Sequence, residues 1–214
     1  MKIGIIGTGK LGSTLGKLWA EKGHTIIFGS REPQKAKKLG NLVGFNSMGG
    51  TYEEAKESGD VVVLAVPWSA AKEAIELAGD LKEKIVVDCT ATVSPHVGGL
   101  LKGLTISGAE KVAKWAENAK IIKTVHTIGV ESLNKVEFGT QKASLFICGD
   151  DMNGKSIVKQ LGTEIGFDVI DTGPLINARL IEPLAMLWVE LAYNQGMGTD
   201  IAFKLLTRRK SKFS

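Results

Sequence analysis

The sequence predicts an α/β fold of the Rossmann-like, doubly wound type, with a mainly parallel sheet and a small C-terminal helical part. Short apolar runs alternate with segments of helical periodicity, which is typical of a parallel sheet covered on both faces. The first run leads directly into a glycine-rich turn that opens a helix. The last part of the chain carries one long apolar helical pattern. We therefore expect a nucleotide-binding domain over residues 1–172 and a helical segment over residues 173–214.

The elements follow one another in βα order. Apolar runs predict strands at residues 1–6, 24–28, 60–66, 84–90, 121–126, 143–148 and 167–171, with a strand or loop at 42–50. Helical patterns predict a first helix from the glycine turn to residue 21 and another that begins at residue 51. Further helices are predicted over residues 33–39, 69–78, 107–118, 152–165, 175–195 and 199–206. Residues 91–104 read as a long loop.

Helix ends carry recognisable signals. Thr51 with Glu54 forms a capping-box pattern, and Ser69 is expected to cap the following helix. Gly196-Met197-Gly198 should end the helix at 175–195. That helix is apolar all round, so it should be buried, and a homodimer with Trp188 and Leu191 in the interface is the simplest explanation.

The first turn has the form GxGxxG: Gly7, Thr8, Gly9, Lys10, Leu11 and Gly12. Gly7 allows the tight turn, Gly9 removes a side chain that would block a pyrophosphate, and Gly12 lets helix and strand pack closely. A pyrophosphate would then lie on the free N–H groups at the positive end of the helix. Because the motif follows a strand and opens a helix, it predicts dinucleotide binding.

The end of the second strand indicates which dinucleotide. NAD-binding chains place an acidic residue there for the ribose 2′-hydroxyl, whereas this chain has Ser30 and Arg31, with Lys35 one helical turn further on. Arg pairs with phosphate in a bidentate way and Lys adds a point charge. The residues favour NADP(H); a glycine-rich turn before a solvated basic helix is the alternative.

Composition excludes several classes of function. The 27 basic and 23 acidic residues give a net charge of +4, and the whole excess lies in residues 207–214, so nucleic-acid binding is not indicated. No apolar run is long enough to span a bilayer, and no signal peptide is evident. Cys89 and Cys148 lie in apolar runs and fit small buried side chains of a reducing compartment. We expect a cytoplasmic protein without a membrane partner.

Ligands of doubly wound sheets bind beyond the carboxyl ends of the strands. This rule selects the segments at Val66 to Trp68, at residues 90–94 (with Ala91 and Val93), at His126 to Ile128, and the turn at Gly173 and Pro174. His126 either hydrogen-bonds a bound ring or orients a loop. No residue set has metal-ligand spacing.

The chain also lacks a Ser-x-x-x-Lys or Tyr-x-x-x-Lys pair placed to protonate an alcohol or ketone. A hydride exchange between two cofactors needs no such group, since it requires only two stacked rings with their reacting carbons about 3–3.5 Å apart.

Several motifs occur in an order that resembles a known family. They are the GxGxxG turn, Gly29-Ser-Arg, Val66-Pro-Trp, Val125-His-Thr-Ile, Ile147-Cys-Gly-Asp-Asp, Asp171-Thr-Gly-Pro-Leu, Asn177-Ala-Arg-Leu-Ile-Glu and Asn194-Gln-Gly-Met-Gly. Together they resemble the NADPH-dependent reductases of the deazaflavin coenzyme F420, from Met1 to about Leu206. Two places differ from the family pattern. One is the loop that begins at Asp88, and the other is Gly129, which stands where the family has Pro. Both lie where the second ring would rest.

The resemblance implies a dimeric enzyme with named binding residues. Residues 8–11 would hold the pyrophosphate, and Ser30, Arg31 and Lys35 the 2′-phosphate. Trp68, Ala91, Val93 and Val130 would line the nicotinamide side. The deazaflavin would lie near His126, Ile128 and the loop that contains Met197.

The resemblance therefore implies hydride transfer between NADP(H) and coenzyme F420, with a small-molecule electron acceptor or donor as the partner. Two alternatives remain. One is a related NADPH-dependent reductase of a flavin, quinone or small carbonyl. The chain also resembles the cytosolic part of membrane ferric reductases, which pass hydride from NADPH to a flavin. The other is a non-catalytic NADPH-binding regulatory protein.

Overall fold

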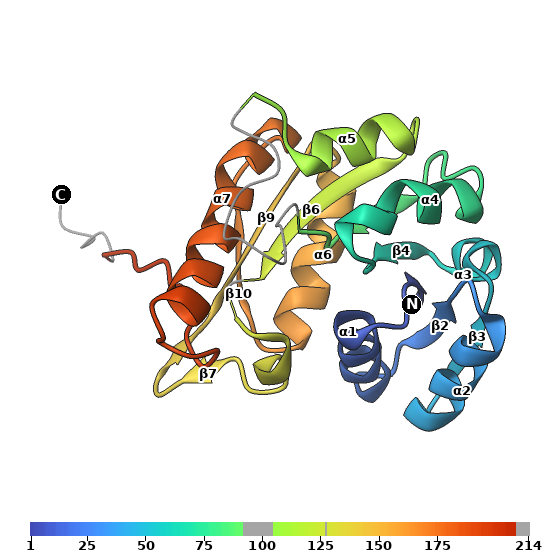
Figure 1. Ribbon diagram of the computed structural model, residues 1–214, viewed down its shortest axis with the longest axis horizontal. Coiled ribbons are helices and arrows are strands. Elements are labelled where there is room, and N and C mark those ends of the chain that lie inside the picture. Colours follow the sequence, from blue (N-terminus) through green and yellow to red (C-terminus); the bar gives the residue numbers. More distant parts are fainter. Residues whose placement is uncertain (92–104, 127, 209–214) are drawn as a thin grey trace, which may run out of the picture.

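A twisted sheet with helices on both faces organises the chain (Figure 1). The computed structural model describes residues 1–91, 105–126 and 128–208. Within these residues eight strands form one sheet in the order β10-β9-β6-β5-β4-β1-β2-β3. Neighbouring strands are parallel except β6 and β9, which are antiparallel. The predicted fold class is confirmed.

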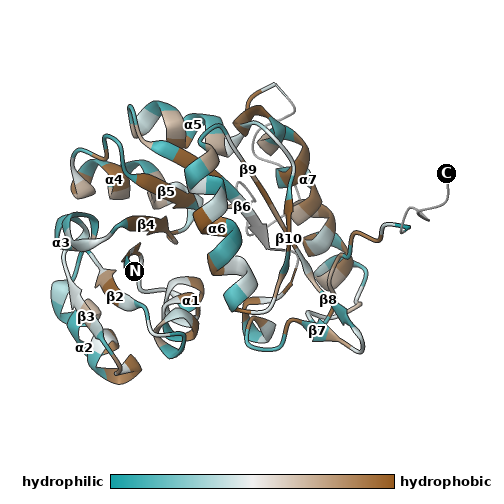
Figure 2. Ribbon diagram, turned by 180° about the vertical axis from the view of Figure 1, so that it is seen from behind, coloured by the Kyte–Doolittle hydropathy of each residue, from teal (hydrophilic) through white to brown (hydrophobic). Residues whose placement is uncertain are grey.

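The sheet is built from short strands. They are β1 (Lys2–Ile6), β2 (Thr25–Gly29), β3 (Ser47–Gly50), β4 (Val61–Leu64), β5 (Ile85–Asp88), β6 (Lys120–His126), β9 (Ser144–Gly149) and β10 (Asp168–Asp171), with a separate hairpin of β7 (Glu137–Phe138) and β8 (Gln141–Lys142). Every residue of β4 is buried, because alternate side chains point to opposite faces and both faces are covered. In Figure 2 this strand is uniformly hydrophobic.

Helices cover the sheet on two sides. They are α1 (Lys10–Glu21), α2 (Pro33–Val43), α3 (Tyr52–Ser58), α4 (Trp68–Ala78), α5 (Gly108–Trp115), α6 (Met152–Glu164) and α7 (Ala178–Val189), with short 3₁₀ turns η1 (Val130–Ser132) and η2 (Leu175–Asn177). One core holds Leu15 of α1 and Leu161 of α6 against β1 and β4. The other holds Ile75 of α4 and Ile181 of α7 against the opposite face.

Helix starts agree with the sequence at two places and differ at one. The capping box predicted at Thr51 and Glu54 is present, and an equivalent box at Ser107 and Glu110 begins α5. The predicted cap at Ser69 is wrong. Pro67 precedes the helix, so Ser69 already lies inside its first turn, where its hydroxyl cannot cap.

The long helical span near the C-terminus is confirmed, with a change of hydrogen bonding along it. The turn η2 leads into α7, and α7 continues into the π-helical turn η3 (Glu190–Asn194). Gly196 and Gly198, both with positive φ, end the span as predicted. The loop predicted at 91–104 lies, apart from Ala91, outside the described residues.

The helix predicted at 199–206 is wrong. Residues 201–205 run back along the sheet and use their backbone groups there: the Ser144 N–H donates to the Phe203 carbonyl (2.9 Å), and the Leu205 N–H donates to the Ser144 hydroxyl (3.1 Å). Lys204 also pairs with Asp168 of β10. Because these partners lie on other elements, the segment cannot form its own i→i−4 hydrogen bonds.

Candidate active site

The glycine-rich turn connects β1 to α1. Gly7 has φ +125°, and a Cβ there would lie 2.3 Å from the Ala65 carbonyl oxygen. A Cβ at Gly12 would lie 2.3 Å from the Gly7 carbonyl oxygen, so the close approach of helix and strand requires glycine. Around Gly9, by contrast, no described atom lies within 4 Å of an added Cβ. Gly9 is the N-cap of α1, without a side-chain cap, so the space in front of the helix start is open.

A second feature lies at the end of β2. A cavity of about 380 Å³ is lined by Ser30, Arg31, Thr51, Tyr52, Glu53 and Leu77. The Arg31 guanidinium lies 3.3 Å from a Glu73 carboxylate oxygen, and both side chains are more than half exposed. The Ser30 hydroxyl accepts the Glu32 N–H. Besides this weak surface pair, Arg31 also interacts with Tyr52, so more than one group of this cavity holds its guanidinium.

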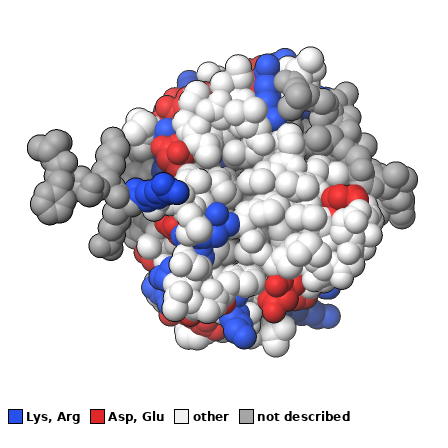
Figure 3. All heavy atoms as spheres, turned by 90° about the vertical axis from the view of Figure 1, so that its left-hand side faces the viewer, with Lys and Arg blue, Asp and Glu red and all other residues white. Residues whose placement is uncertain are grey.

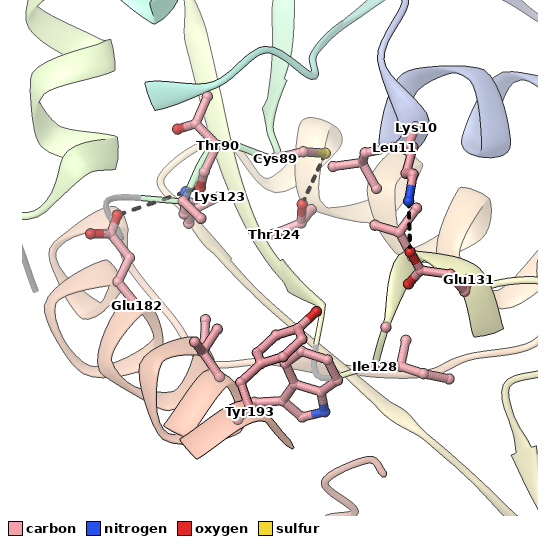
Figure 4. A pocket seen from close by; sticks show the side chains of 16 residues that line it. Lys10, Leu11, Cys89, Thr90, Lys123, Thr124, Ile128, Glu131, Glu182 and Tyr193 are labelled. Atoms are coloured by element: carbon pink, nitrogen blue, oxygen red, sulfur yellow. Dashed lines mark hydrogen bonds and ion pairs between the residues drawn. The ribbon is translucent and has the colours of Figure 1, made fainter. Parts of the chain in front are cut away.

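The central cavity lies between the start of α1, the carboxyl ends of β5 and β6, and α7 (Figure 4). Its volume is about 310 Å³. Lys10 and Leu11 come from α1, and residues from 89 to 91 follow β5. The remaining lining residues are Lys123, Thr124, Ile128, Gly129, Val130 and Glu131 on one side, and Glu182, Ala185, Trp188, Val189 and Tyr193 on the other. The position agrees with the rule for doubly wound sheets.

Charged groups are buried at one end of this cavity. The Lys123 ammonium lies 3.1 Å from Asp88 Oδ2 and 3.8 Å from Glu182 Oε1, and it also donates to the Thr90 carbonyl. Lys123 is 1% exposed and Asp88 0%. Burial opposes the charge, but the Asp88 and Glu182 carboxylates raise the pKa of Lys123 above its usual value, so the ammonium stays protonated.

Glu182 connects α7 to α5. Its carboxylate accepts the backbone N–H groups of Gly108 (2.9 Å) and Ala109 (3.0 Å) at the start of α5. One helical turn before Glu182, Arg179 donates two hydrogen bonds to Glu110, and these lower the pKa of Glu110 to about 2. These contacts fix the helix that forms one wall of the cavity.

Two further groups face the cavity. Lys10 pairs with Glu131 at 3.1 Å in an exposed position. Desolvation raises the pKa of Cys89 to about 12, so its thiol is not a nucleophile near neutral pH.

Comparison with known proteins follows this geometry. Residues 2–92 match the profile of the family described as NADP oxidoreductase, coenzyme F420-dependent. An F420-dependent NADP reductase of Methanothermobacter thermautotrophicus is 29% identical over 210 residues, covering 89% of each chain. The family resemblance is confirmed.

Two other relatives extend the comparison. A structure from Arthrobacter sp. FB24, provisionally assigned as an F420-dependent NADP reductase, superposes with a TM-score of 0.87 at 26% identity, covering 97% of this chain and all of that one. The metalloreductase STEAP3 of Rattus norvegicus is 29% identical over 87% of this chain but only 37% of its own length. The predicted class of enzyme, an NADP-dependent oxidoreductase, is confirmed.

The structure brings part of the predicted site together. Five of the predicted binding residues line the central cavity, namely Lys10, Leu11, Ala91, Ile128 and Val130. Ser30 and Arg31 line the cavity at the end of β2, and Lys35 is exposed nearby on α2.

Other predicted residues lie elsewhere. Trp68 stacks on Trp115 of α5, with ring centroids 5.2 Å apart, and neither Trp68 nor Val66 lines the described cavities. Met197 is exposed in the turn after η3. Val93 lies outside the described residues, and His126 is placed only as the last residue of β6.

Sequence reasoning missed the buried charges and the aromatic wall. Lys123 follows the apolar pair Ile121-Ile122 in a strand, and Glu182 stands among apolar residues of a helix; a charge at such a position was the available signal. Trp188 was expected at a dimer interface. It is instead buried in its own chain, where its indole N–H donates to the Ile201 carbonyl, and it lines the cavity.

The part of the chain that the structure describes has neither a metal cluster nor a membrane-spanning helix. No group of His, Cys, Asp and Glu side chains in this part of the chain could hold a metal ion. None of the described helices is both long and apolar enough to cross a membrane.

Proposed function

We propose that this protein transfers a hydride between NADP(H) and the deazaflavin coenzyme F420. The observation that carries the proposal is the central cavity, which lies beside the open helix start and has mostly apolar walls. A planar ring system fits such a space, and the Methanothermobacter relative is named F420-dependent NADP reductase.

The dinucleotide would follow the carboxyl edge of the sheet. Its pyrophosphate would lie over residues 8–11, where the space beside Gly9 and the N–H groups of α1 suit an anion. Its 2′-phosphate would be held by Ser30, Arg31 and Lys35, and its nicotinamide would enter the central cavity beside Ala91 and Val130. When bound, NADPH supplies the hydride.

The acceptor ring would stack on the nicotinamide. Ile128 is the predicted contact that lines the cavity, while Trp68, Val93, His126 and Met197 stay proposals from the family pattern. The chain's task is to hold two rings with reacting carbons about 3–3.5 Å apart and to exclude water between them.

A screen of acceptors tests the proposal. NADPH oxidation is measured at 340 nm with coenzyme F420, FMN, FAD, a quinone and a small carbonyl. We expect the highest kcat/KM with F420. A faster reaction with a flavin would assign the second substrate to that class, and tight NADPH binding without oxidation by any of these acceptors would indicate a regulatory protein.

Cofactor choice is tested separately. NADPH should bind much more tightly than NADH, and Arg31→Ala should remove most of the difference, about ten- to a hundredfold in affinity. Glu73→Gln is the matched variant, because it removes the charge pair with Glu73 but keeps Arg31, and it should not weaken NADPH binding. Equal affinities of the parent protein for both nucleotides, by calorimetry, would contradict the assignment.

We also propose a cytoplasmic homodimer. The surface over α7 is largely uncharged (Figure 3), and Ile176, Leu180 and Leu187 are exposed there one helical turn or two apart. A second copy would cover this face through a twofold contact.

A further inference from the structure

Among the described residues, the buried ammonium at the end of the central cavity has one N–H without a hydrogen-bond acceptor. An ammonium has three N–H groups. Among the described residues, Lys123 donates to Asp88 Oδ2 and to the Thr90 carbonyl, and the next acceptor, Glu182 Oε1, lies at 3.8 Å, beyond hydrogen-bond distance. Lys123 also lines the cavity, so its remaining N–H can reach a ligand there.

The two carboxylates around Lys123, those of Asp88 and Glu182, differ in their other hydrogen-bond partners. Asp88 is bound directly by the ammonium and also accepts the N–H and the hydroxyl of Thr90. Glu182 is already engaged by two backbone N–H groups at the positive end of α5. Glu182 lines the cavity beside Lys123 and pairs with it (Figure 4), so what the ammonium offers a ligand is one N–H rather than a net positive charge.

We propose that Lys123 donates its free N–H to the carbonyl end of the hydride-accepting ring. This inference rests on the proposed function and names the class of acceptor: a ring in which the atom that takes the hydride, a carbon in a deazaflavin and a nitrogen in a flavin, is conjugated to an imide or amide carbonyl. Deazaflavins and flavins belong to this class.

The charge balance explains why a fixed N–H donor helps. The C–H bond at C4 of NADPH breaks, a C–H bond forms on a deazaflavin ring (an N–H bond on a flavin), and a ring electron pair moves onto the conjugated N–C=O group. The nicotinamide becomes cationic, and the acceptor takes its proton from water afterwards. An N–H donor placed where negative charge develops stabilises the transition state more than the ground state. The raised pKa of Lys123 fits this electrostatic role better than proton donation.

The test compares four forms of the full-length protein: the parent, Lys123→Met, Asp88→Asn, and the two together. Lys123→Met alone leaves Asp88 buried without its counter-charge and can impair folding, whereas the double variant removes both charges. Asp88→Asn is the matched control that keeps the ammonium. Circular dichroism checks folding, and fluorescence titration measures NADPH affinity.

Three results are expected. The double variant should bind NADPH within about twofold of Asp88→Asn, and its kcat/KM for F420 should be about ten- to a hundredfold lower than that of Asp88→Asn, as for a lost hydrogen bond to a charged group. The third readout needs no turnover. With NADP⁺ present, the absorbance of bound F420 reports the pKa of its ring. In Asp88→Asn this pKa should be lower than in the double variant by about one pH unit or more. A merely structural lysine would not move this ionisation.

The outcomes separate the two proposals. A parent protein that oxidises NADPH with none of the acceptors overturns the proposed function and this inference with it. If the parent turns over F420 and the double variant matches Asp88→Asn in kcat/KM and in ring ionisation, the inference alone is overturned. Weaker NADPH binding with unchanged F420 kinetics would place the lysine on the nicotinamide and would also overturn it.

Discussion

Replacing Gly9 by alanine should weaken NADPH binding without destabilising the fold. Gly9 has φ −76° and ψ −177°, an extended conformation open to any residue, and an added methyl group meets no described atom within 4 Å. Glycine-to-alanine changes at compatible positions stabilise a protein by about 0.4–1 kcal/mol through the unfolded chain. The melting temperature of Gly9→Ala should therefore stay the same or rise slightly.

Binding should respond in the opposite direction. The methyl group would occupy the space proposed for the pyrophosphate, and overpacking by one carbon costs about 1–3 kcal/mol, or about five- to a hundredfold in affinity. Calorimetric titration with NADPH measures this loss, and a thermal melt without ligand measures stability.

Gly12→Ala is the matched comparison. Its Cβ would lie 2.3 Å from the Gly7 carbonyl oxygen, so this variant should melt several degrees lower even without ligand. If Gly9→Ala binds NADPH as tightly as the parent, the pyrophosphate does not approach Gly9. If it melts as low as Gly12→Ala, the reasoning from free space is wrong.

Three other predictions concern stability, assembly and chemistry. The pKa of Glu110, lowered from 4.5 to about 2 chiefly by Arg179, means that this group stabilises the fold fully above about pH 4.5 and less as the pH falls towards 2. Thermal melts between pH 5 and pH 2 should therefore fall less steeply in Arg179→Met than in the parent, and equal slopes would contradict the pairing. Leu187→Asp should convert the proposed dimer to a monomer in light scattering, whereas Leu42→Asp, at an exposed site on α2, should not; a parent that is monomeric at micromolar concentration rules the dimer out. His126→Ala should slow turnover less than about tenfold, since loss of a general acid costs about 10²–10⁴-fold, and deuterium from C4 of NADPH should appear on the acceptor. A loss above about a thousandfold with intact NADPH binding, or deuterium washed out to solvent, would show that proton chemistry at His126 had been overlooked.

Local patterns predicted most of the fold. The strands of the sheet and the capping box at Thr51 depend on neighbours in sequence, so the residues alone indicated them. The helix predicted at 199–206 failed because the hydrogen-bond partners of Phe203 and Leu205 lie at Ser144, far away in sequence. A periodic pattern cannot reveal such a competitor.

The candidate site was predictable in the same measure. The geometry of the glycine turn is local, so the sequence indicated it, while the binding role of the Ser30-Arg31 pair stays a prediction. The charge cluster could not be assembled from the sequence, since Asp88, Lys123 and Glu182 come from β5, β6 and α7 and meet only when the sheet and the last helix have packed. A lysine that follows two apolar residues in a strand indicates a buried partner but does not identify it.

The return of residues 201–205 along the sheet has a consequence for synthesis in the cell. Trp188 and Tyr193 form a wall of the central cavity, and the indole of Trp188 is held by the Ile201 carbonyl, while Phe203 and Lys204 attach the same segment to β9 and β10. A nascent chain still missing these residues can form the glycine turn and the first strands, but its cavity lacks a fixed wall. Under the proposed function this wall lies beside the second ring, so we expect hydride transfer only after this segment has left the ribosome.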